Sequence, residues 1–202
     1  LIMKIICENI SKNFGSKKVI KNFSKKFKKK SYAILGKNGS GKSTLLKIIA
    51  NLLIPSSGII DYKLNNKNLV KENIIKNIFF SAPYQELINE LSLEEFLNFH
   101  FKFREKRQSV KEQIDYFGLN KYKNNLISDL SSGLEQKLRL LIAFNTKSEF
   151  LFLDEPTTNL DKDGKSLYKE MYKNILNEKG IIIATNDRND IIDRNTTIIN
   201  LS

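Results

Sequence analysis

The stretch GKNGSGKST, Gly36 to Thr44, constrains this chain more than any other feature of its sequence. It fits the pattern G-x-x-x-x-G-K-[ST] through Gly36, Gly41, Lys42 and Ser43. The apolar segment SYAILG precedes it, and the helical pattern KSTLLKIIANLL follows. Glycines let successive backbone N–H groups point into one concavity, and the positive end of the following helix points there too. The sequence therefore predicts a strand, a phosphate-binding loop and a helix in direct succession.

The residue types in this loop suit a nucleoside triphosphate. Lys42 can reach the β- and γ-phosphates, and the Ser43 hydroxyl suits Mg²⁺. We expect the whole loop to bind the nucleotide: Gly36, Lys37, Asn38, Gly39, Ser40, Gly41, Lys42, Ser43 and Thr44.

A second motif, FLFLDEP, spans Phe150 to Pro156. Four apolar residues end in two acids, which is typical of a buried strand that delivers carboxylates at its C-terminal edge. Ligands of open α/β sheets bind at that edge. We expect Asp154 to hold Mg²⁺, directly or through water, and Glu155 to polarise the attacking water.

The pattern along the chain alternates strands with helices, which predicts an α/β fold with a mainly parallel sheet. Helical spacing at 88–132 interrupts this alternation and indicates an inserted subdomain. Leu45, Ile48, Ile49 and Leu52 are expected on one buried face of the first helix. The expected strands are MKIICENI, VIKNFSKKF, SYAILG, GIIDYK, NIFFSAP, FLFLD, GIIIAT and TTIINL.

Composition narrows the class of protein. With 202 residues and 41% hydrophobic content, the chain can bury the core of one domain. No apolar run approaches the roughly 20 residues that cross a membrane, and the one cysteine, Cys7, allows no internal disulfide. We therefore expect a cytosolic protein.

The net charge of +12 is compatible with nucleic acid, an anionic membrane surface or phosphate ligands. The densest basic run, Lys25 to Lys30, is interpreted as a solvated turn between two strands. Few aromatic residues are interleaved with this charge, so the sequence does not favour a base-stacking surface.

The stretch LSSGLEQK, Leu130 to Lys137, completes a set of motifs. Together they resemble the nucleotide-binding subunit of ABC (ATP-binding cassette) transporters, over nearly the whole chain. Leu130, Ser131 and Gly133 match the signature LSGGQ, while Ser132 stands where glycine is commoner. The resemblance implies one domain, with a P-loop NTPase core at 1–87 and 133–202, an N-terminal antiparallel β-subdomain and a helical subdomain at about 88–132.

The resemblance also implies a mechanism in which two cassettes pair head to tail around two Mg-ATP. Ser131 and the Gly133 N–H would grip the γ-phosphate of the partner's ATP, and Ser131 could also act as an ordinary helix cap. Gln85 would touch Mg²⁺ and the attacking water and sense the membrane partner. Phe14 would stack on adenine, the alternative being a core or surface phenylalanine. Asp161 would lie near the dimer seam and could cap a helix.

One position departs from the family pattern. Asn186 stands where the family has a histidine that contacts the γ-phosphate, and the only histidine of the chain, His100, lies in the helical insert. An asparagine amide can donate a hydrogen bond to a phosphate oxygen but cannot become cationic. We expect normal ATP binding and slower hydrolysis.

The leading functional hypothesis is an ATP-hydrolysing motor subunit at the inner face of the membrane. Its partners would be a transmembrane permease and a second, like or unlike, cassette. The segment 86–104 would form the docking groove, with Phe96, Phe99, Phe101 and Phe103 either exposed there or filling the subdomain core. The alternatives are a soluble ABC-type ATPase acting on ribosomes or nucleic acid, which is less favoured, and a low-turnover nucleotide sensor. The sequence determines neither the cargo nor the direction of transport.

Overall fold

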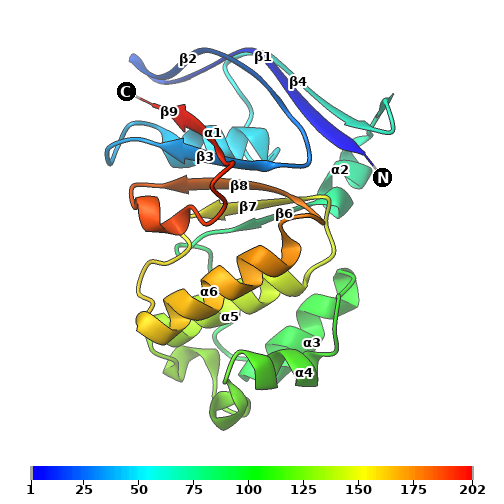
Figure 1. Cartoon of the computed structure of the whole chain (residues 1–202), viewed down its shortest axis with the longest axis vertical. Helices are drawn as coiled ribbons and strands as arrows, with labels where there is room; N and C mark the ends of the chain where they lie inside the picture. Colours follow the sequence, from blue (N-terminus) through cyan, green and yellow to red (C-terminus); the bar gives the residue numbers. More distant parts are fainter. Residues whose placement is uncertain (1, 202) are drawn as a thin grey trace. The chain divides into compact units, whose positions relative to one another are not determined.

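A computed structural model describes residues 2–201 (Figure 1). Residue contacts divide the chain into two units. The first contains the chain up to Phe80, Ser148–Glu155 and the chain from Leu176 onward. The second contains Ser81–Lys147 and Pro156–Ile175. No helix within residues 2–201 is both long and apolar enough to cross a membrane.

The first unit begins with an antiparallel sheet of strand order β2-β1-β4-β5. The strands are β1 (Met3–Phe14), β2 (Lys17–Phe27), β4 (Ser57–Leu64) and β5 (Lys67–Asn68). Alternate residues of β1, including Met3, Ile5 and Cys7, are buried, as expected for a sheet with one face in the core. Register shifts along the β1–β2 pair mark bulges, which bend the hairpin.

The other sheet of this unit has the order β6-β7-β8-β3-β9, and its β7–β8, β8–β3 and β3–β9 pairs are parallel. Its strands are β3 (Ser31–Leu35), β6 (Ile78–Ser81), β7 (Phe150–Asp154), β8 (Gly180–Thr185) and β9 (Thr197–Asn200). Every residue of β3, β7 and β8 is buried, as is typical of the central strands of a parallel sheet. This arrangement confirms the predicted α/β class.

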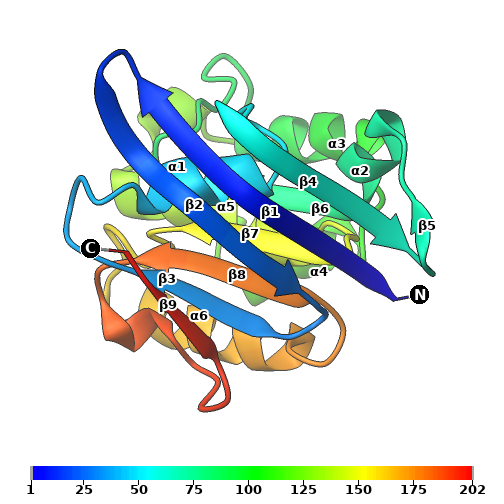
Figure 2. The ribbon, with the colours of Figure 1, turned by 90° about the horizontal axis from the view of Figure 1, so that it is seen from above.

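Helix α1 (Lys42–Ile49) contacts strands of both sheets (Figure 2). Its residues Leu45, Leu46, Ile48 and Ile49 are fully buried, so this helix fills the core between the sheets. A shorter helix, α2 (Lys71–Asn77), precedes β6. The charged segment KENIIKN carries too few apolar residues for its helical period to be recognised in the sequence.

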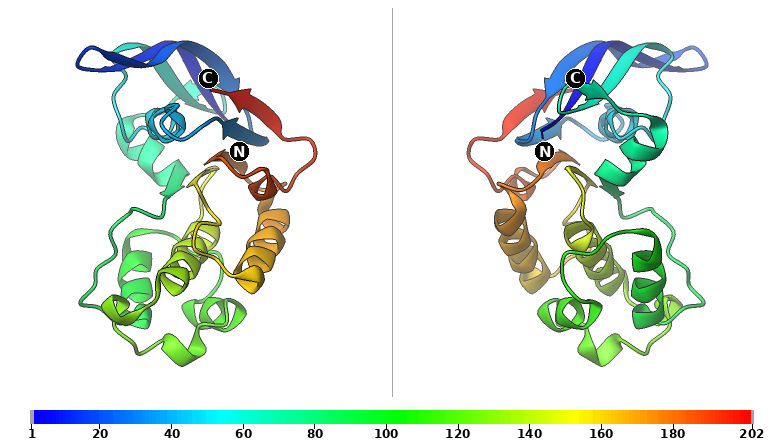
Figure 3. Two further views of the ribbon diagram at one scale, coloured as in Figure 1. Left: turned by 90° about the vertical axis from the view of Figure 1, so that its left-hand side faces the viewer. Right: turned by 90° about the vertical axis from the view of Figure 1, so that its right-hand side faces the viewer.

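The second unit is helical: α3 (Leu93–Phe103), α4 (Val110–Tyr116), α5 (Ser132–Asn145) and α6 (Lys162–Ile175). Helices α5 and α6 lie side by side, joined by the rings of Phe144 and Tyr168, and α4 packs on α5 (Figure 3). Capping boxes begin two helices, Ser92 with Glu95 for α3 and Ser109 with Glu112 for α4. Residues 2–201 also contain three short 3₁₀ turns, two of them in this unit: Asn120–Tyr122, Ile127–Asp129 and Arg188–Asp190.

Several sequence expectations need correction. Leu52 is 57% exposed, because α1 ends at Ile49 and Asn51 takes a left-handed conformation that turns the chain away. The run Lys25–Lys30 is only partly a turn, since β2 continues to Phe27.

Other expectations hold or stay open. Val110, Ile114 and Phe117 are buried, and their spacing is that of one helical face. Among the expected groove aromatics, Phe96 is buried whereas Phe99 and Phe103 are exposed. The boundaries predicted for the P-loop core and the helical subdomain stay a prediction.

Candidate active site

The phosphate-binding loop follows β3 and leads into α1. Gly39 and Gly41 have φ values of 80° and 96°, a left-handed conformation that side chains disfavour. A Cβ on Gly36 would lie 2.4 Å from the Ser40 Oγ and 2.5 Å from the Leu201 carbonyl oxygen. The loop can therefore curl this tightly only with glycine at these positions.

The start of α1 suits an anion. Gly41 caps this helix without a side-chain hydrogen bond, and no acidic residue occupies the first turn. The first N–H groups of a helix have no partner within the helix and carry its positive dipole end. The Ser40 hydroxyl is buried and has no hydrogen-bond partner among residues 2–201. These unmatched donors fit the phosphates of a nucleotide.

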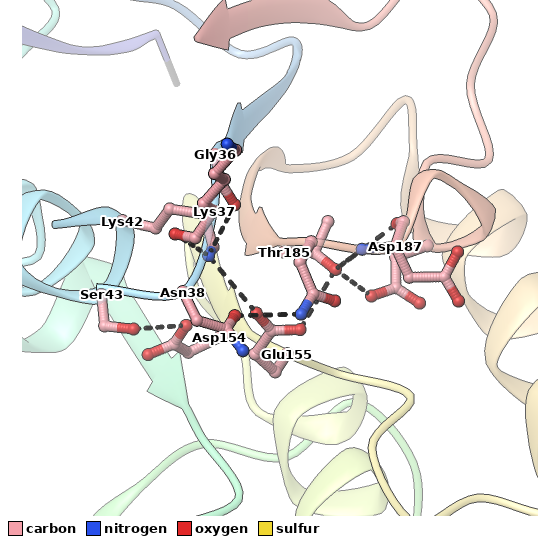
Figure 4. Close-up of polar contacts among 11 residues, drawn as sticks. Gly36, Lys37, Asn38, Lys42, Ser43, Asp154, Glu155, Thr185 and Asp187 are labelled. Atoms are coloured by element: carbon pink, nitrogen blue, oxygen red, sulfur yellow. Dashed lines mark hydrogen bonds and ion pairs between the residues drawn. The ribbon is translucent and has the colours of Figure 1, made fainter. Parts of the chain in front are cut away.

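Lys42 lies at the centre of the loop and is 6% exposed. Its Nζ donates to the carbonyl oxygens of Gly36 at 2.9 Å and Lys37 at 3.2 Å, and lies 3.8 Å from Glu155 Oε1 (Figure 4). A buried ammonium needs such compensation, because its desolvation is costly. The contacts hold the ammonium at the loop concavity.

Ser43 and Asp154 meet at the ends of α1 and β7. The Ser43 hydroxyl donates to Asp154 Oδ1 at 3.0 Å, and Asp154 is buried (Figure 4). Within residues 2–201 no three His, Cys, Asp or Glu side chains cluster as a metal site. Mg²⁺ commonly takes only one or two carboxylates and completes its shell with phosphate oxygens and water. One hydroxyl and one carboxylate beside a phosphate loop therefore fit Mg²⁺.

Glu155 follows directly and has a positive φ of 43°. A non-glycine residue in this region is strained by about 1–2 kcal/mol, and such strain often occurs at functional sites. Burial raises the pKa of the Glu155 carboxyl above its ordinary value, and the Lys42 ammonium offsets part of that shift. A strained, partly desolvated carboxylate beside a phosphate site has the properties of a general base.

Asn186 follows β8 and reaches the phosphate loop. Its Nδ2 donates to Asn38 Oδ1 at 3.1 Å, across 148 positions of sequence. Asn186 is exposed, so its amide is accessible to a ligand in the loop. His100 is in the second unit, half-buried, with Nε2 3.3 Å from Thr146 Oγ1.

Phe14 ends β1 and is 51% exposed. The Lys12 Nζ lies 5.2 Å from the centroid of its ring, a cation–π contact. Phe14 shares a hollow of about 440 Å³ with the phosphate loop. The residues lining it are Phe14, Lys17, Val19, Asn38, Gly39, Gly41, Lys42, Ser43, Thr44 and Glu155. An exposed ring in the same hollow as a phosphate loop fits a stacked base.

The second unit carries the remaining predicted residues. Ser131 caps α5, and its hydroxyl accepts from the Leu134 N–H at 3.4 Å. Asp161 Oδ1 accepts from the Gly164 N–H at 2.7 Å, a bond that lowers the pKa of this carboxyl, and lies 3.5 Å from Lys137 Nζ. A hollow of about 780 Å³ has these residues in its wall. Its lining is Gly118, Asn120, Lys121, Tyr122, Ser131, Ser132, Gly133, Leu134, Lys137, Asn159 and Asp161.

Gln85 also belongs to the second unit. Its Oε1 accepts from the Ala82 N–H at 2.9 Å, so the side chain bonds its own loop. Arg139 on α5 donates to the Gln85 carbonyl oxygen through Nε at 3.2 Å and Nη2 at 2.9 Å, and pairs with Glu135 at 2.9 Å. Sequence reasoning missed Arg139, because an arginine at a helical position gives no sign of a main-chain partner 54 residues away.

The predicted site residues thus form two groups. Phe14, the phosphate loop, Asp154, Glu155 and Asn186 gather in the first unit, and Gln85, Ser131, Gly133 and Asp161 lie in the second. Sequence reasoning also missed Thr185, which contacts Glu155, and Asp190, which accepts from the Thr185 hydroxyl. A threonine at the end of a strand offers only a weak signal of such a role.

The sequence of this chain is similar to those of known proteins. A family model described as ABC transporter matches residues 20–158. The energy-coupling factor transporter ATP-binding protein EcfA1 of Fusobacterium nucleatum is 33% identical over 203 residues, which cover 95% of this chain and 76% of that protein. The zinc import ATP-binding protein ZnuC of Wigglesworthia glossinidia is 30% identical over 198 residues, covering 96% of this chain and 81% of that protein.

A solved structure agrees in fold. A dimeric ATP-binding cassette, in a post-hydrolysis state bound to ADP and Pi, matches 98% of this chain and 94% of that chain with a TM-score of 0.79 at 24% identity. The family model spans more than half of the present chain and contains its phosphate loop and its DEP segment. The chain therefore belongs to the ABC transporter family, as one of its ATP-binding cassettes, and it is an ATPase.

Proposed function

We propose that this chain is the motor subunit of a transporter, which binds and hydrolyses Mg-ATP, pairs head to tail with a second cassette and drives a separate membrane permease. One observation carries the proposal. A buried lysine, a hydroxyl–carboxylate pair and a strained glutamate converge at the phosphate loop of the first unit. Each of these groups matches a requirement of phosphoryl transfer to water.

In the proposed mechanism the loop N–H groups and Lys42 bind the β- and γ-phosphates. Ser43 and Asp154 would hold Mg²⁺, which would supply neutralisation of the phosphate charge when bound. Glu155 takes a proton from the attacking water as its oxygen bonds to the γ-phosphorus. The bond from that phosphorus to the β–γ bridging oxygen breaks, and the products are ADP and phosphate. The amide of Asn186 donates to a γ-phosphate oxygen, and Phe14 stacks on the base.

The second unit is proposed to act on the nucleotide of the partner cassette. Ser131 and the Gly133 N–H lie at the positive end of α5, beside an open hollow. Asp161 lines the same hollow and would lie near the dimer seam. The dimeric cassette of similar fold supports such pairing by analogy.

The membrane partner is inferred from relatives. Those compared are named for energy-coupling factor transport and for zinc import. The proposed location of the working cassette is the inner face of the membrane, bound to that permease. Gln85 and the exposed Phe99 and Phe103 are proposed to face that permease. The cargo is chosen by the permease.

The test is steady-state ATP hydrolysis over a range of protein concentrations, with Glu155→Gln in parallel. Activity should rise more than linearly with protein and fall at least about 100-fold in the variant, because a general base contributes 10²–10⁴-fold. Glu72→Gln, which changes an exposed glutamate of α2 outside the site, serves as the matched control. Wild-type turnover in Glu155→Gln would refute the role given to this residue.

A low-turnover nucleotide sensor is the second candidate, favoured by Asn186 and its bond to Asn38. A motor predicts that Asn186→Ala slows turnover several-fold while ATP binding is retained. Unchanged turnover in Asn186→Ala would show that this amide has no role in hydrolysis. A sensor predicts ATP-dependent dimerisation with negligible hydrolysis in both wild type and variant.

A further inference from the structure

Behind Glu155 lies a pair of buried groups to which the mechanism above gives no role. The Thr185 hydroxyl donates to Asp190 Oδ2 at 2.6 Å, and the same Oγ1 lies 3.3 Å from Glu155 Oε2. Both Thr185 and Asp190 are almost completely buried. Figure 4 shows Thr185 between Glu155 and the turn that carries Asp187.

The threonine oxygen is also the point at which the loop after β8 closes. The Asp187 N–H donates to Thr185 Oγ1 at 3.0 Å, and the Asp190 N–H donates to the Asp187 carbonyl oxygen at 3.2 Å. Asn186 lies between Thr185 and Asp187, which are joined by the bond to Thr185 Oγ1. These bonds hold the backbone around Asn186, whose Nδ2 donates to Asn38 Oδ1 of the phosphate loop at 3.1 Å.

The bond lengths indicate how the contacts rank. A threonine hydroxyl carries one proton and two lone pairs. Asp190 Oδ2 at 2.6 Å and Glu155 Oε2 at 3.3 Å both accept from this hydroxyl, so they share its one proton and the bond to Asp190 is the stronger. With a lone pair taken by the Asp187 N–H, the hydroxyl cannot rotate freely. Glu155 thus accepts the weaker hydrogen bond of a hydroxyl whose oxygen is held in place.

Two backbone N–H groups also join Glu155 to the end of β8. The Glu155 N–H donates to the Ala184 carbonyl oxygen at 2.8 Å, and the Asn186 N–H bonds the Glu155 carboxylate. Glu155 is strained at its positive φ, so its side chain needs external support to hold one orientation. Thr185 provides a support that is itself anchored in the core by Asp190.

We infer that Thr185 and Asp190 act as a positioning pair, which holds the Glu155 carboxylate and the Asn186 amide in the orientation that hydrolysis requires. The pair touches no substrate and acts through Glu155 and Asn186. The inference deepens the proposed function and rests on it. It predicts that loss of the Thr185 hydroxyl impairs the chemical step and spares nucleotide binding.

The central test compares Thr185→Val, which keeps the shape and removes the hydroxyl, with Thr185→Ser, which keeps the hydroxyl. We expect kcat to fall about tenfold or more in Thr185→Val, with KM and the Kd for ATP within about twofold, because a misplaced base slows only the chemical step. Thr185→Ser should retain most of kcat. A kcat within twofold of wild type in Thr185→Val, or equal losses in Val and Ser, would overturn the inference.

Thr196→Val is the matched control, because it removes a hydroxyl bonded to Ser31 Oγ at 2.7 Å in the same unit. It should leave kcat unchanged. A loss of kcat in Thr196→Val as large as that in Thr185→Val would mean a general structural effect and would count against the pair.

A second variant covers the case in which Thr185→Val does not fold. Asp190→Asn keeps the size and an acceptor oxygen but weakens the hydrogen bond. Its kcat should fall less than in Thr185→Val, and the double variant should lose no more than the worse single one, since the two residues act as a unit. Fully additive losses would contradict the pairing.

Failure of the proposed function gives a different result. If Glu155→Gln keeps turnover, the role of the base is wrong and the pair has nothing to position. If Glu155→Gln abolishes turnover and Thr185→Val leaves kcat intact, only the positioning inference is lost.

Discussion

Two glycine-containing turns of this molecule, one in each unit, begin a helix in different ways. In the first unit, α1 starts at Gly41, which is left-handed and offers no side-chain cap. In the second, α5 starts at Ser131, whose hydroxyl bonds the Leu134 N–H. The first turn thus leaves its helix N–H groups for a ligand, while the second satisfies one of its own.

The residues around the two turns also differ in how well they suit a bound anion. The phosphate loop contains a buried lysine whose ammonium needs three oxygen neighbours, and it admits only glycine at its tightest points. At the second turn, Gly133 has no positive φ, and a Cβ there would lie 3.0 Å from the Asn159 carbonyl oxygen. The loop of the first unit has the shape of an anion-binding site. The turn of the second unit is a helix cap, beside which an anion of a partner cassette could also bind.

The largest difference should come from the two lysines that stand near these turns. Lys42→Ala is expected to lower ATP affinity and turnover at least about 100-fold, because it removes a buried positive charge from the loop concavity. Lys137→Ala removes a partly exposed partner of Asp161 in the second unit and should leave ATP binding by the monomer unchanged. Fluorescent-nucleotide titration measures both variants. Equal losses of ATP affinity in the two variants would refute the assignment of ATP binding by the monomer to the first turn.

Ser131→Arg should separate binding from hydrolysis. The bulky cation in the second hollow would block a partner cassette, so turnover should fall at least about tenfold while the monomer binds ATP with wild-type affinity. Size-exclusion chromatography with ATP would report loss of the dimer. Ser131→Ala is the milder control, costing about 0.5–1 kcal/mol of stability through the lost cap. ATP-driven dimerisation that persists in Ser131→Arg would remove the proposed role of Ser131.

Alanine substitutions of Gly41 and Gly133 compare the two turns directly through ATP affinity. In Gly41→Ala the new Cβ meets Val19 Cγ1 at 2.8 Å and the backbone keeps a φ of 96°, so we expect ATP affinity to fall about tenfold. Gly133→Ala requires only a small backbone shift and should leave ATP binding by the monomer within about twofold. Titration of both variants, with thermal unfolding as a folding check, tests the ranking. A larger loss of affinity in Gly133→Ala would reverse it.

The smallest expected effect concerns pH and acts through the one histidine of the sequence, His100, which lies in the second unit. Burial, with a smaller contribution from Arg104, lowers the pKa of His100 to about 4. The unfolded chain therefore takes up a proton first. The stabilisation from neutral His100 is complete above about pH 6.5 and is lost as pH falls toward 4. The melting temperature should fall less over this range in His100→Gln than in wild type, and parallel curves would contradict the prediction.

Part of the site could be read from the sequence because its information is local. Gly36 to Ser43 are contiguous, and their glycines, lysine and serine suffice to specify a phosphate loop between a strand and a helix. The apolar run before Asp154 likewise predicts a buried strand that ends in a carboxylate. The alternation of strands and helices was recognisable for the same reason, because apolar periodicity is a local property of the chain.

Tertiary structure decided what the local pattern could not. Leu52 has the spacing of a core residue, yet the helix ends before it and leaves it exposed. Gln85 is held by its own loop and by a side chain 54 residues away. No periodicity encodes such partners, because a side-chain pattern specifies a face and not what that face will meet.

The sequence alone thus determined the chemistry of the phosphate loop, the DE pair and the alternation of strands and helices. The strand order β7-β8-β3 decided the rest. It places the carboxyl ends of three strands side by side, so that Lys42, Glu155 and Thr185 come within reach although the chain separates them widely. The physical reason is that pairing of parallel strands depends on long-range packing and connection geometry, whereas the residues that perform chemistry are defined by their own functional groups.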